Sequence, residues 1–481
     1  MALKIIPTRL ENELTGENMQ QFFHPSSIAV FGVADNPRNL ARNIISNCLA
    51  MGFKGKIYPV GKRPGTVHGL IIITDPKALP KDIDLAVLLI PARSIPETMQ
   101  VCARKGIRHV IISSGGFREL TGCTSNEELE ILEVARRYGI RIIGPNCIGV
   151  MCTDSGLCTP FNPIQVKKLK KGPVSIIVQS GGVTTQCAYY FSDEYVGFSK
   201  IISAGNKLDL NEIDFLEYLI KDQETSQIHM YLESIEDGRK LMALAKTSEK
   251  PLVVFKSNVS STARGVAYSH TAALSNDDRV VDGALRQAGI LRVENLRDMV
   301  IAAKGLSLPP LRGNRLAVLS MSGGFAVILG DACEKMGFTC PDLPKQIIKK
   351  IGTYSRAGVI KMANPMDLGD IHDPKGLIVA IESCMDLEFI DGVVLSFIYD
   401  PEVEKIFGRK IGPPDRILQF LKDLSQAKNK PIAFSPFAQR EEIEGFKRRG
   451  TFPVFNDPVE CVMGLRFLRD YWRSKTRSDS P

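Results

Sequence analysis

One histidine of the sequence, His270, stands where an imidazole could act on a substrate. It lies in Arg264-Gly-Val-Ala-Tyr-Ser-His-Thr-Ala-Ala-Leu-Ser-Asn-Asp277, whose small and polar residues are typical of an exposed loop leading into a helix. An imidazole can attack phosphorus and form a phosphohistidine, provided that one ring nitrogen is free and an acceptor holds the other. The pattern alone leaves a surface histidine without a catalytic role as the alternative.

Glu233 and Ser180-Gly-Gly182 are groups that such chemistry could use. Glu233 closes the run Ile228-His-Met-Tyr-Leu-Glu233, at the carboxyl end of an expected strand, where parallel sheets bind their ligands. The two glycines precede an expected helix at 183–191 and leave backbone amides free to hold a phosphoryl group. The tripeptide recurs at Ser322-Gly-Gly324, so a turn without a ligand is the alternative for each, as a surface glutamate is for Glu233.

The first turn between a strand and a helix is a third candidate. In Val30-Phe-Gly-Val-Ala-Asp-Asn-Pro-Arg38, a strand runs into Gly32 and a helix is expected from about Asn39. An open parallel sheet places a phosphate on the free amides of such a helix, and Arg38 and Arg42 add positive charge. The turn lacks the GxGxxG pattern and the later acidic residue, which disfavours NAD and a plain dehydrogenase. A turn without a ligand is the alternative.

The sequence gives little support for a metal site. It holds no His-x-x-His or Glu-x-x-His pair, and Cys147, Cys152 and Cys158 are loosely spaced with no histidine nearby, unlike zinc ligands. Cys147 has no identifiable base partner to make it a nucleophile. We therefore expect no metal site.

Short apolar runs rich in β-formers alternate with amphipathic helical stretches, such as 96–105 and 126–138. This alternation predicts an α/β fold with mostly parallel sheets. The expected strands fall into three blocks, at 27–32, 56–60, 84–92, 108–116 and 141–146; at 173–182, 199–206, 228–233 and 251–257; and at 315–324, 392–399, 431–436 and 453–456.

The length also suggests three domains, because the chain has 481 residues and a typical domain has about 150. A basic connector at 166–172 and a Pro/Gly segment at 308–313 mark the boundaries, with a solvated loop as the alternative for each. Val174–Gly182 and Leu316–Gly324 are similar to each other, which favours two related flavodoxin-like domains. We expect domains at 1–150, 151–308 and 309–481.

The composition is that of an ordinary globular chain. Hydrophobic residues make up 44% and charged residues 24%, which excludes wholesale disorder and collagen-like classes. Lys+Arg 61 against Asp+Glu 53 gives a net charge of +8, which suits an anionic ligand without requiring nucleic acid. Eleven cysteines without a CxxC pair or a signal peptide predict free thiols in the cytosol, and no apolar run approaches the ~18 residues of a membrane span.

In their order along the chain, these features resemble the α-subunit of ADP-forming acyl-CoA synthetases, in the succinyl-CoA synthetase superfamily. The resemblance runs from about Phe22 to Trp472. Each fragment is weak, but their order and spacing are specific. The fragments are Phe23–Gly32, Gly52–Val60, Ile111–Gly116, Ile143–Gly149, Val178–Gly182, Ser203–Lys207, Tyr231–Arg239, Ser269–Thr271 and Asn364–Leu368.

The resemblance implies a CoA-binding Rossmann-type domain followed by two flavodoxin-like domains. It also assigns residues by position. The phosphates of CoA would meet Gly32, Asn36, Arg38 and Lys62; the pantetheine and thiol path would be lined by Ser113, Ser114 and Gly115; and Asn146 would stand near the acyl group. His270 would carry the phosphoryl group, Glu233 would hydrogen-bond its imidazole, and Ser180, Gly181 and Gly182 would hold the phosphate.

The chain departs from the family pattern at a few positions. Relatives often have Ser at position 34 and Gly at positions 38 and 41, where this chain has Ala34, Arg38 and Ala41. Loss of glycine can push the backbone away from a pyrophosphate, although Arg38 adds charge. Ala272 stands where relatives usually have Gly after Ser-His-Thr. Three of these four departures fall in the CoA-binding turn, whereas His270 and Glu233 match the family pattern.

The implied reaction is acyl-CoA + phosphate + ADP ⇌ carboxylate + CoA + ATP, through an acyl phosphate and a phosphohistidine. The expected domains leave no residues for an ATP-grasp module, so the resemblance implies a separate ATP-grasp β-subunit, with ADP or ATP and Mg²⁺ bound there, in an α2β2 heterotetramer. A CoA-binding regulatory paralogue without turnover is the alternative, favoured by the altered first turn. The acyl group and the choice between ADP and GDP stay open.

Overall fold

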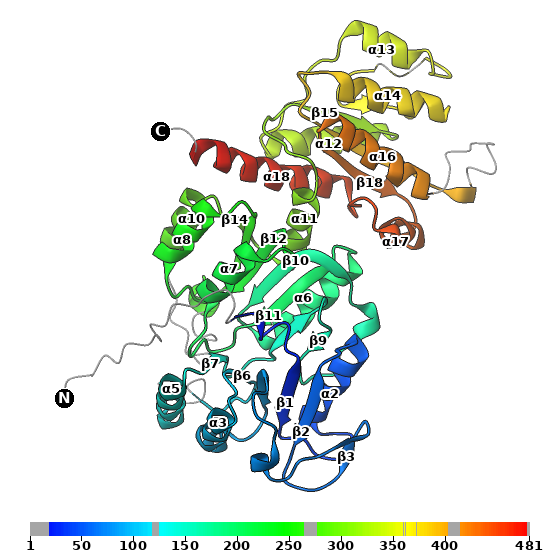
Figure 1. Cartoon of the computed structure of the whole chain (residues 1–481). Coiled ribbons are helices and arrows are strands. Elements are labelled where there is room, and N and C mark those ends of the chain that lie inside the picture. Colours follow the sequence, from blue (N-terminus) through cyan, green and yellow to red (C-terminus); the bar gives the residue numbers. More distant parts are fainter. Residues whose placement is uncertain are drawn as a thin grey trace. The chain divides into compact units, whose positions relative to one another are not determined.

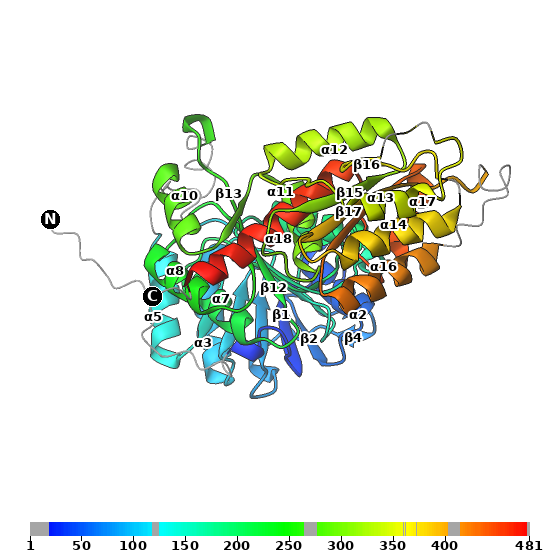
Figure 2. The same ribbon diagram turned by 90° about the horizontal axis from the view of Figure 1, so that it is seen from above.

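The structure is a computed structural model, which describes residues 19–117, 125–263, 277–358, 360, 362–371, 373–402 and 414–478. The chain divides into two compact units, shown as ribbons in Figure 1 and from above in Figure 2. Unit 1 comprises Met1–Asp193 and Gly197–Leu296, and unit 2 comprises Glu194–Val196 and Arg297–Pro481. The three-domain division remains a prediction.

The first sheet of unit 1 is parallel, and its described strands follow the order β2-β1-β5-β6-β7. The chain goes from β1 to β2 on one side and then crosses to β5 on the other, so a topological switch point lies between β1 and β5, where such sheets bind ligands. The elements are β1 (Ser27–Phe31), α2 (Leu40–Met51), β2 (Lys56–Val60), β3 (Thr66–Val67), β4 (Leu70–Ile71), β5 (Leu85–Leu88), α3 (Ile95–Arg104), β6 (His109–Ile112), α5 (Asn126–Tyr138) and β7 (Arg141–Ile143).

Alternating side chains of β1 explain how helices cover both faces of this sheet. Ala29 and Phe31 belong to one buried apolar cluster with residues of α3 and α5, which lie side by side in Figure 1. Ile28 and Val30 belong to a second cluster with residues of α2. A strand buried on both faces is typical of a parallel sheet between helical layers. The predicted α/β class, with parallel sheets, is confirmed.

The second sheet of unit 1 follows the order β14-β13-β12-β10-β11-β8-β9 within the described residues. Its switch point lies between β10 and β12, and β8 pairs antiparallel with β11. The antiparallel edge of β8 and β9 was not predicted. The elements are β8 (Val150–Cys152), β9 (Leu157–Cys158), β10 (Lys171–Val178), α6 (Gly181–Asp193), β11 (Phe198–Ser203), α7 (Glu212–Lys221), β12 (Gln227–Leu232), α8 (Gly238–Thr247), β13 (Leu252–Lys256), α10 (Asp278–Gln287) and β14 (Leu291–Val293).

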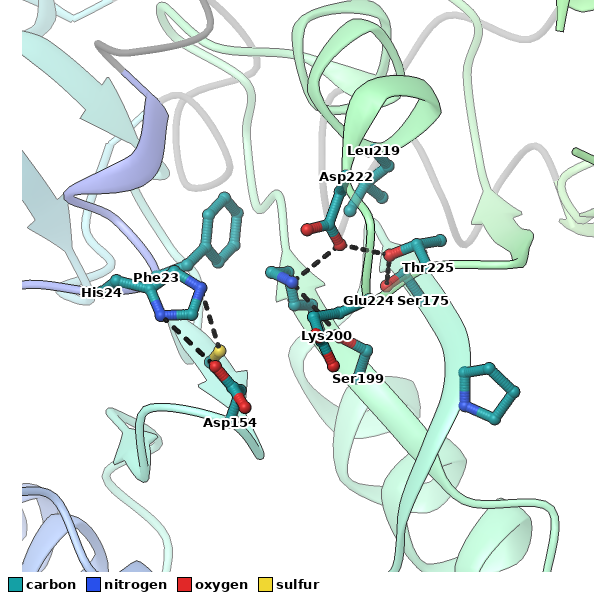
Figure 3. Close-up of polar contacts among 12 residues, drawn as sticks. Phe23, His24, Asp154, Ser175, Ser199, Lys200, Leu219, Asp222, Glu224 and Thr225 are labelled. Atoms are coloured by element: carbon teal, nitrogen blue, oxygen red, sulfur yellow. Dashed lines mark hydrogen bonds and ion pairs between the residues drawn. The ribbon is translucent and has the colours of Figure 1, made fainter.

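The amino end of the second sheet carries a polar cluster formed by side chains of β10, β11 and the segment between α7 and β12 (Figure 3). The buried ammonium of Lys200 in β11 lies 2.7 Å from a carboxylate oxygen of Asp222. That carboxylate also accepts a hydrogen bond from Thr225, whose hydroxyl oxygen lies 2.7 Å from that of Ser175 in β10. These buried polar groups are bonded to one another, and the ligand site of a parallel sheet lies at the carboxyl end of its strands.

Unit 2 contains a parallel sheet with the described order β16-β15-β17-β18. The predicted strand at 453–456 is wrong, because Val454 makes only an isolated bridge with Phe434. The described elements are α11 (Leu296–Leu306), β15 (Leu316–Ser320), α12 (Gly323–Lys335), α13 (Lys345–Gly352), β16 (Met366–Asp367), α14 (Pro374–Asp386), β17 (Gly392–Ile398), α16 (Pro414–Lys428), β18 (Ile432–Phe437), α17 (Arg440–Arg449) and α18 (Pro458–Ser478). None of the described helices of the chain combines the length and apolarity needed to cross a membrane.

Candidate active site

The turn after β1 leaves room for a ligand at the switch point of the first sheet. Gly32 has a φ of 93°, and a Cβ there would lie 2.1 Å from the carbonyl oxygen of Leu89, just after β5. Both the left-handed backbone and the close approach require glycine. A pocket of about 410 Å³ opens here, lined by Gly32, Ala34, Asn36, Arg38, Asn39, Leu40, Ala41 and Leu89.

Asn39 fixes the shape of this turn. Its side-chain oxygen caps α2 by accepting from the Arg42 amide at 2.9 Å and also accepts from the Ala34 amide at 3.2 Å. Its side-chain nitrogen donates to the Gly32 carbonyl at 3.0 Å. A cap of this kind orients the first helical amides toward the pocket, where an anion is favoured by the helix dipole.

The predicted CoA-phosphate residues have different places around this turn. Asn36 and Arg38 line the pocket, and the Asn36 side chain accepts from the Arg38 amide at 2.9 Å. Arg38 is exposed, whereas Arg42 lies 3.4 Å from a carboxylate oxygen of Asp35. Lys62 is exposed in the loop after β2 and is absent from the pocket lining. An exposed lysine on a nearby loop suits a terminal phosphate better than the pocket floor.

The segment after β6 places its residues at the same sheet edge. Ser114 is occupied structurally, because its hydroxyl donates to the Ile90 carbonyl at 2.5 Å and accepts from the Ile90 amide at 3.0 Å. The Ser113 hydroxyl is buried beside the Cys147 thiol and makes no other hydrogen bond among the described residues. Gly115 is exposed. Of the three residues predicted for the pantetheine path, Ser113 therefore has the spare polar group.

Asn146 joins the edges of the two sheets of unit 1. It has a φ of 57° and donates through its side-chain nitrogen to the side-chain oxygen of Asn206 at 3.3 Å. The Asn206 amide in turn donates to the Pro145 carbonyl at 2.8 Å. Burial raises the pKa of the neighbouring Cys147 thiol to about 12, so this cysteine is no nucleophile at neutral pH.

The second part of the site is the turn between β10 and α6, at the switch point of the second sheet. Ser180 precedes the helix, and its carbonyl accepts from both the amide and the hydroxyl of Thr184, at 3.0 and 2.7 Å. A Cβ on Gly181 would meet only a methyl of Ile148, at 3.0 Å, and one on Gly182 would meet no described atom within 4 Å. The turn thus leaves space in front of the helix N-terminus, where backbone amides attract anions.

Glu233 lies beside this turn, immediately after β12. Its amide donates to the side-chain oxygen of Gln179 at 2.9 Å, and Gln179 directly precedes Ser180. The structure therefore brings together the predicted phosphate-binding tripeptide and the predicted carboxylate, which are 51 residues apart (233 − 182) in the sequence.

Three residues of this site were missed from the sequence. Gln179, Lys207 and Lys256 all contact the main chain of Glu233 or Ser234. Lys207 is buried and lies 3.0 Å from a carboxylate oxygen of Glu212. Gln179 and Lys207 stood inside fragments of the family resemblance, but a contact to a main-chain atom leaves no sequence pattern.

His270 lies outside the described residues, so its predicted role remains a prediction. No group of three or more His, Cys, Asp and Glu side chains suited to a metal ion occurs in the described ranges.

Comparisons with known proteins agree with this division of the site. The family model described as "CoA binding domain" matches residues 26–153, which contain the pocket at Gly32. The family model described as "Succinyl-CoA ligase like flavodoxin domain" matches residues 171–306, which contain Ser180 and Glu233.

The chain is 34% identical to the α-subunit of acetate–CoA ligase (ADP-forming) II of Pyrococcus furiosus, covering 73% of this chain and 76% of that protein. It is 32% identical to the α-subunit of isozyme I of the same organism, covering 95% and 99%. The solved structure of acetyl-coenzyme A synthetase 1 of Ca. Korarchaeum cryptofilum, in complex with phosphate and ADP, matches with a TM-score of 0.84 and 26% identity over 96% of this chain and 99% of that one. This chain belongs to the family of ADP-forming acetate–CoA ligases.

Proposed function

We propose that this chain is the α-subunit of an ADP-forming acyl-CoA synthetase, which interconverts acyl-CoA, phosphate and ADP with a carboxylate, CoA and ATP. The observation that carries the proposal is the placement of Glu233 beside the open Ser180–Gly182 turn at one switch point. A helix N-terminus for an anion next to a carboxylate for an imidazole is what transfer of a phosphoryl group through histidine requires.

CoA lies along the carboxyl edge of the first sheet. The α2 amides and Arg38 bind its phosphates at the pocket around Gly32, and Lys62 meets a terminal phosphate. The pantetheine runs past Ser113, Ser114 and Gly115 toward Asn146, whose contact with Asn206 brings the thioester to the second sheet. The pocket at Gly32 supports this path, because glycine lets the backbone approach a pyrophosphate closely.

Two transfers occur at the second switch point. A phosphate oxygen attacks the thioester carbonyl, the C–S bond breaks, and CoA leaves with the electron pair of that bond. A ring nitrogen of His270 then attacks the phosphorus of the acyl phosphate, and the carboxylate leaves. Glu233 accepts the hydrogen bond of the other ring nitrogen, and the amides of Ser180–Gly182 stabilise the negative charge on the phosphoryl oxygens.

The nucleotide is bound by a partner. Because the two P. furiosus relatives are named as α-subunits, a partner subunit is expected here as well. We propose that it carries the ATP-grasp site, with ADP and Mg²⁺, in an α2β2 assembly. Copurification of the chain with an ATP-grasp protein from its own cells tests this. The cytosol, suggested by the cysteine pattern, stays a prediction.

A labelling experiment tests the proposed chemistry. The purified chain is incubated with [³²P]phosphate and a panel of acyl-CoA thioesters that includes acetyl-CoA, and protein-bound phosphate is measured. We expect an acid-labile, base-stable label in the wild type and none in His270→Asn. A wild type that takes no label from any thioester would contradict catalysis and leave the CoA-binding paralogue. If His270→Asn took as much label as the wild type, another residue would have to carry the phosphoryl group.

A further inference from the structure

The main chain around Glu233 is held by side chains on both sides of β12. The amides of Glu233 and Ser234 both donate to the side-chain oxygen of Gln179, at 2.9 and 3.1 Å. The Glu233 carbonyl accepts from the ammonium of Lys256 at 2.8 Å, and the Ser234 carbonyl accepts from that of Lys207 at 3.1 Å. All four polar main-chain groups of the two residues are therefore bonded to side chains from β13, the residue that follows β10 and the loop after β11.

Lys256 differs from the ordinary salt-bridged lysines of the chain. It is the last residue of β13, it is 4% exposed, and its ammonium donates to the carbonyls of Glu233 and Ser257. Across the described ranges it forms no salt bridge with a carboxylate, in contrast to Lys207, which pairs with Glu212 and Glu236. A buried charge that is satisfied by carbonyl dipoles alone is costly to keep, so a gain elsewhere must offset it.

The charged groups around Lys256 come from four elements. Burial lowers its pKa to about 8, Asp278 of α10 and Glu233 raise it, and Arg292 of β14 and Lys207 lower it. Its ammonium thus loses its proton within a pH range in which enzymes can be assayed, which provides a readout of its charge.

We propose that Lys256 is a positioning residue for Glu233. By tying the Glu233 carbonyl to the end of β13, while Gln179 ties the Glu233 amide to the end of β10, it fixes the direction in which the carboxylate leaves the main chain. Preorganised supports of this kind hold a functional group within a fraction of an ångström of its working place. The role of Glu233 rests on the proposed function, whereas the tie itself rests on the hydrogen bonds.

Lys250 provides a matched control at the other end of the same strand. It precedes β13, and its ammonium also donates to two carbonyls, those of Leu219 at 2.8 Å and Asp222 at 2.6 Å. Burial lowers its pKa as well. Leu219 and Asp222 lie at the amino end of the sheet (Figure 3). Lys250→Met therefore removes the same kind of contact, far along the strand from Glu233.

The first test compares the rate of phosphohistidine formation in the full chain for wild type, Lys256→Met and Lys250→Met. We expect Lys256→Met to be slower by roughly 10- to 100-fold, the usual cost of losing a support of a reacting group, with the KM for acyl-CoA unchanged. The rates of wild type and Lys250→Met should fall as the pH rises through about 8, and Lys256→Met should lack that step. Equal rates in the two variants, or no step in wild type, would overturn the proposal.

The second test does not depend on turnover. Hydrogen exchange of the Glu233 and Ser234 amides is measured in the three proteins, because these amides donate to Gln179 and loosen if the main chain is released. We expect faster exchange in Lys256→Met than in Lys250→Met, and equal exchange would refute the tie. If the wild type takes no phosphate label but the exchange difference is found, only the proposed function is contradicted. If the wild type is labelled but the exchange difference is missing, only the positioning role of Lys256 is contradicted.

Discussion

The turns at Ser180 and Ser322 share the sequence Ser-Gly-Gly, and each lies between the first parallel strand of its sheet and the helix that follows, yet their surroundings differ. In unit 1, a Cβ on the first glycine, Gly181, would lie 3.0 Å from a methyl of Ile148. In unit 2, a Cβ on Gly323 would lie 2.6 Å from a carboxylate oxygen of Asp367, the last residue of β16. Among the described atoms, a Cβ on the second glycine would meet nothing at Gly182 and only the Ser322 hydroxyl, at 3.9 Å, at Gly324. The turns therefore differ at the first glycine, which faces a methyl in unit 1 and a carboxylate in unit 2.

The neighbouring strands cause this difference. Beside the Ser180 turn, the next strand end on one side is that of β12, where Lys207 and Lys256 donate to the main chain. Beside the Ser322 turn stands Asp367, which accepts from the Gly369 amide at 2.9 Å. A helix N-terminus favours an anion, but an anion already placed there repels a second. The same tripeptide therefore predicts a phosphate site in unit 1 and none in unit 2.

The largest effect is expected from removing the carboxylate of the first turn. Glu233→Gln should lower the rate of phosphohistidine formation by roughly 100-fold or more, because the neutral amide oxygen lacks the negative charge with which a carboxylate stabilises an imidazolium. Asp367→Asn is the matched change in unit 2 and should change the rate by no more than about 2-fold. That is far less than the 10-fold change that corresponds to about 1.36 kcal/mol of activation free energy. Labelling with [³²P]phosphate measures both, and a large loss in Asp367→Asn would break the distinction between the turns.

The next largest effect is expected from a substitution that gives the first turn a carboxylate, as the second turn has. In Gly182→Asp the new Cβ meets no described atom within 4 Å. Its carboxylate should compete for the helix amides and raise the phosphate concentration for half-maximal labelling by roughly 10-fold. Gly324→Asp, whose Cβ would meet only the Ser322 hydroxyl at 3.9 Å, is the control. An unchanged phosphate requirement in Gly182→Asp would mean that phosphate binds elsewhere.

A stability measurement tests the crowding of the second turn. Gly323→Ala should lower the free energy of unfolding by about 1–3 kcal/mol, because its methyl is forced against Asp367, and Asp367→Ala should relieve that loss in the double variant. Gly181→Ala, whose methyl would meet Ile148 at 3.0 Å, should cost about 1 kcal/mol or less. Urea denaturation gives the values, and an unrelieved double variant would show that the carboxylate is not the cause.

The last effect is a pH dependence of stability that comes from the buried cation beside the first turn. The pKa of Lys256 is lowered from 10.5 to about 8 in the folded chain, so the unfolded chain binds more protons between these values. The stability of wild type relative to Lys256→Met should therefore rise as the pH increases from about 8 to 10.5. Denaturation of both proteins across this range measures it. A difference that stays constant or falls would mean that Lys256 keeps an ordinary pKa.

The sequence predicted the parts of the fold that depend on local pattern. The expected strand at 56–60 coincides with β2, and the expected helix at 126–138 with α5, where Ser125 and Glu128 form a capping box. The antiparallel edge of β8 and β9 escaped prediction, because two- and three-residue strands carry too little alternation. The segment 453–456 looked like a strand by its apolar residues, but only Val454 bridges to β18.

The sequence predicted the candidate site to the extent that it predicted where the strands end. Glu233 and Ser180 each follow an apolar run, and parallel strands bring their carboxyl ends to one edge, as the contact through Gln179 shows. The sequence could not predict that a carboxylate faces the first glycine of only one Ser-Gly-Gly turn, because Asp367 approaches Gly323 only in the folded sheet. The roles of the site residues remain predictions.

The position of bound phosphate tests the central claim most directly. Crystals of the chain soaked with inorganic phosphate should show density for the anion at the amides of Ser180–Gly182, next to Glu233, and none at Ser322–Gly324. Phosphate bound at the Ser322 turn, or absent from the Ser180 turn at concentrations that support labelling, would contradict the account.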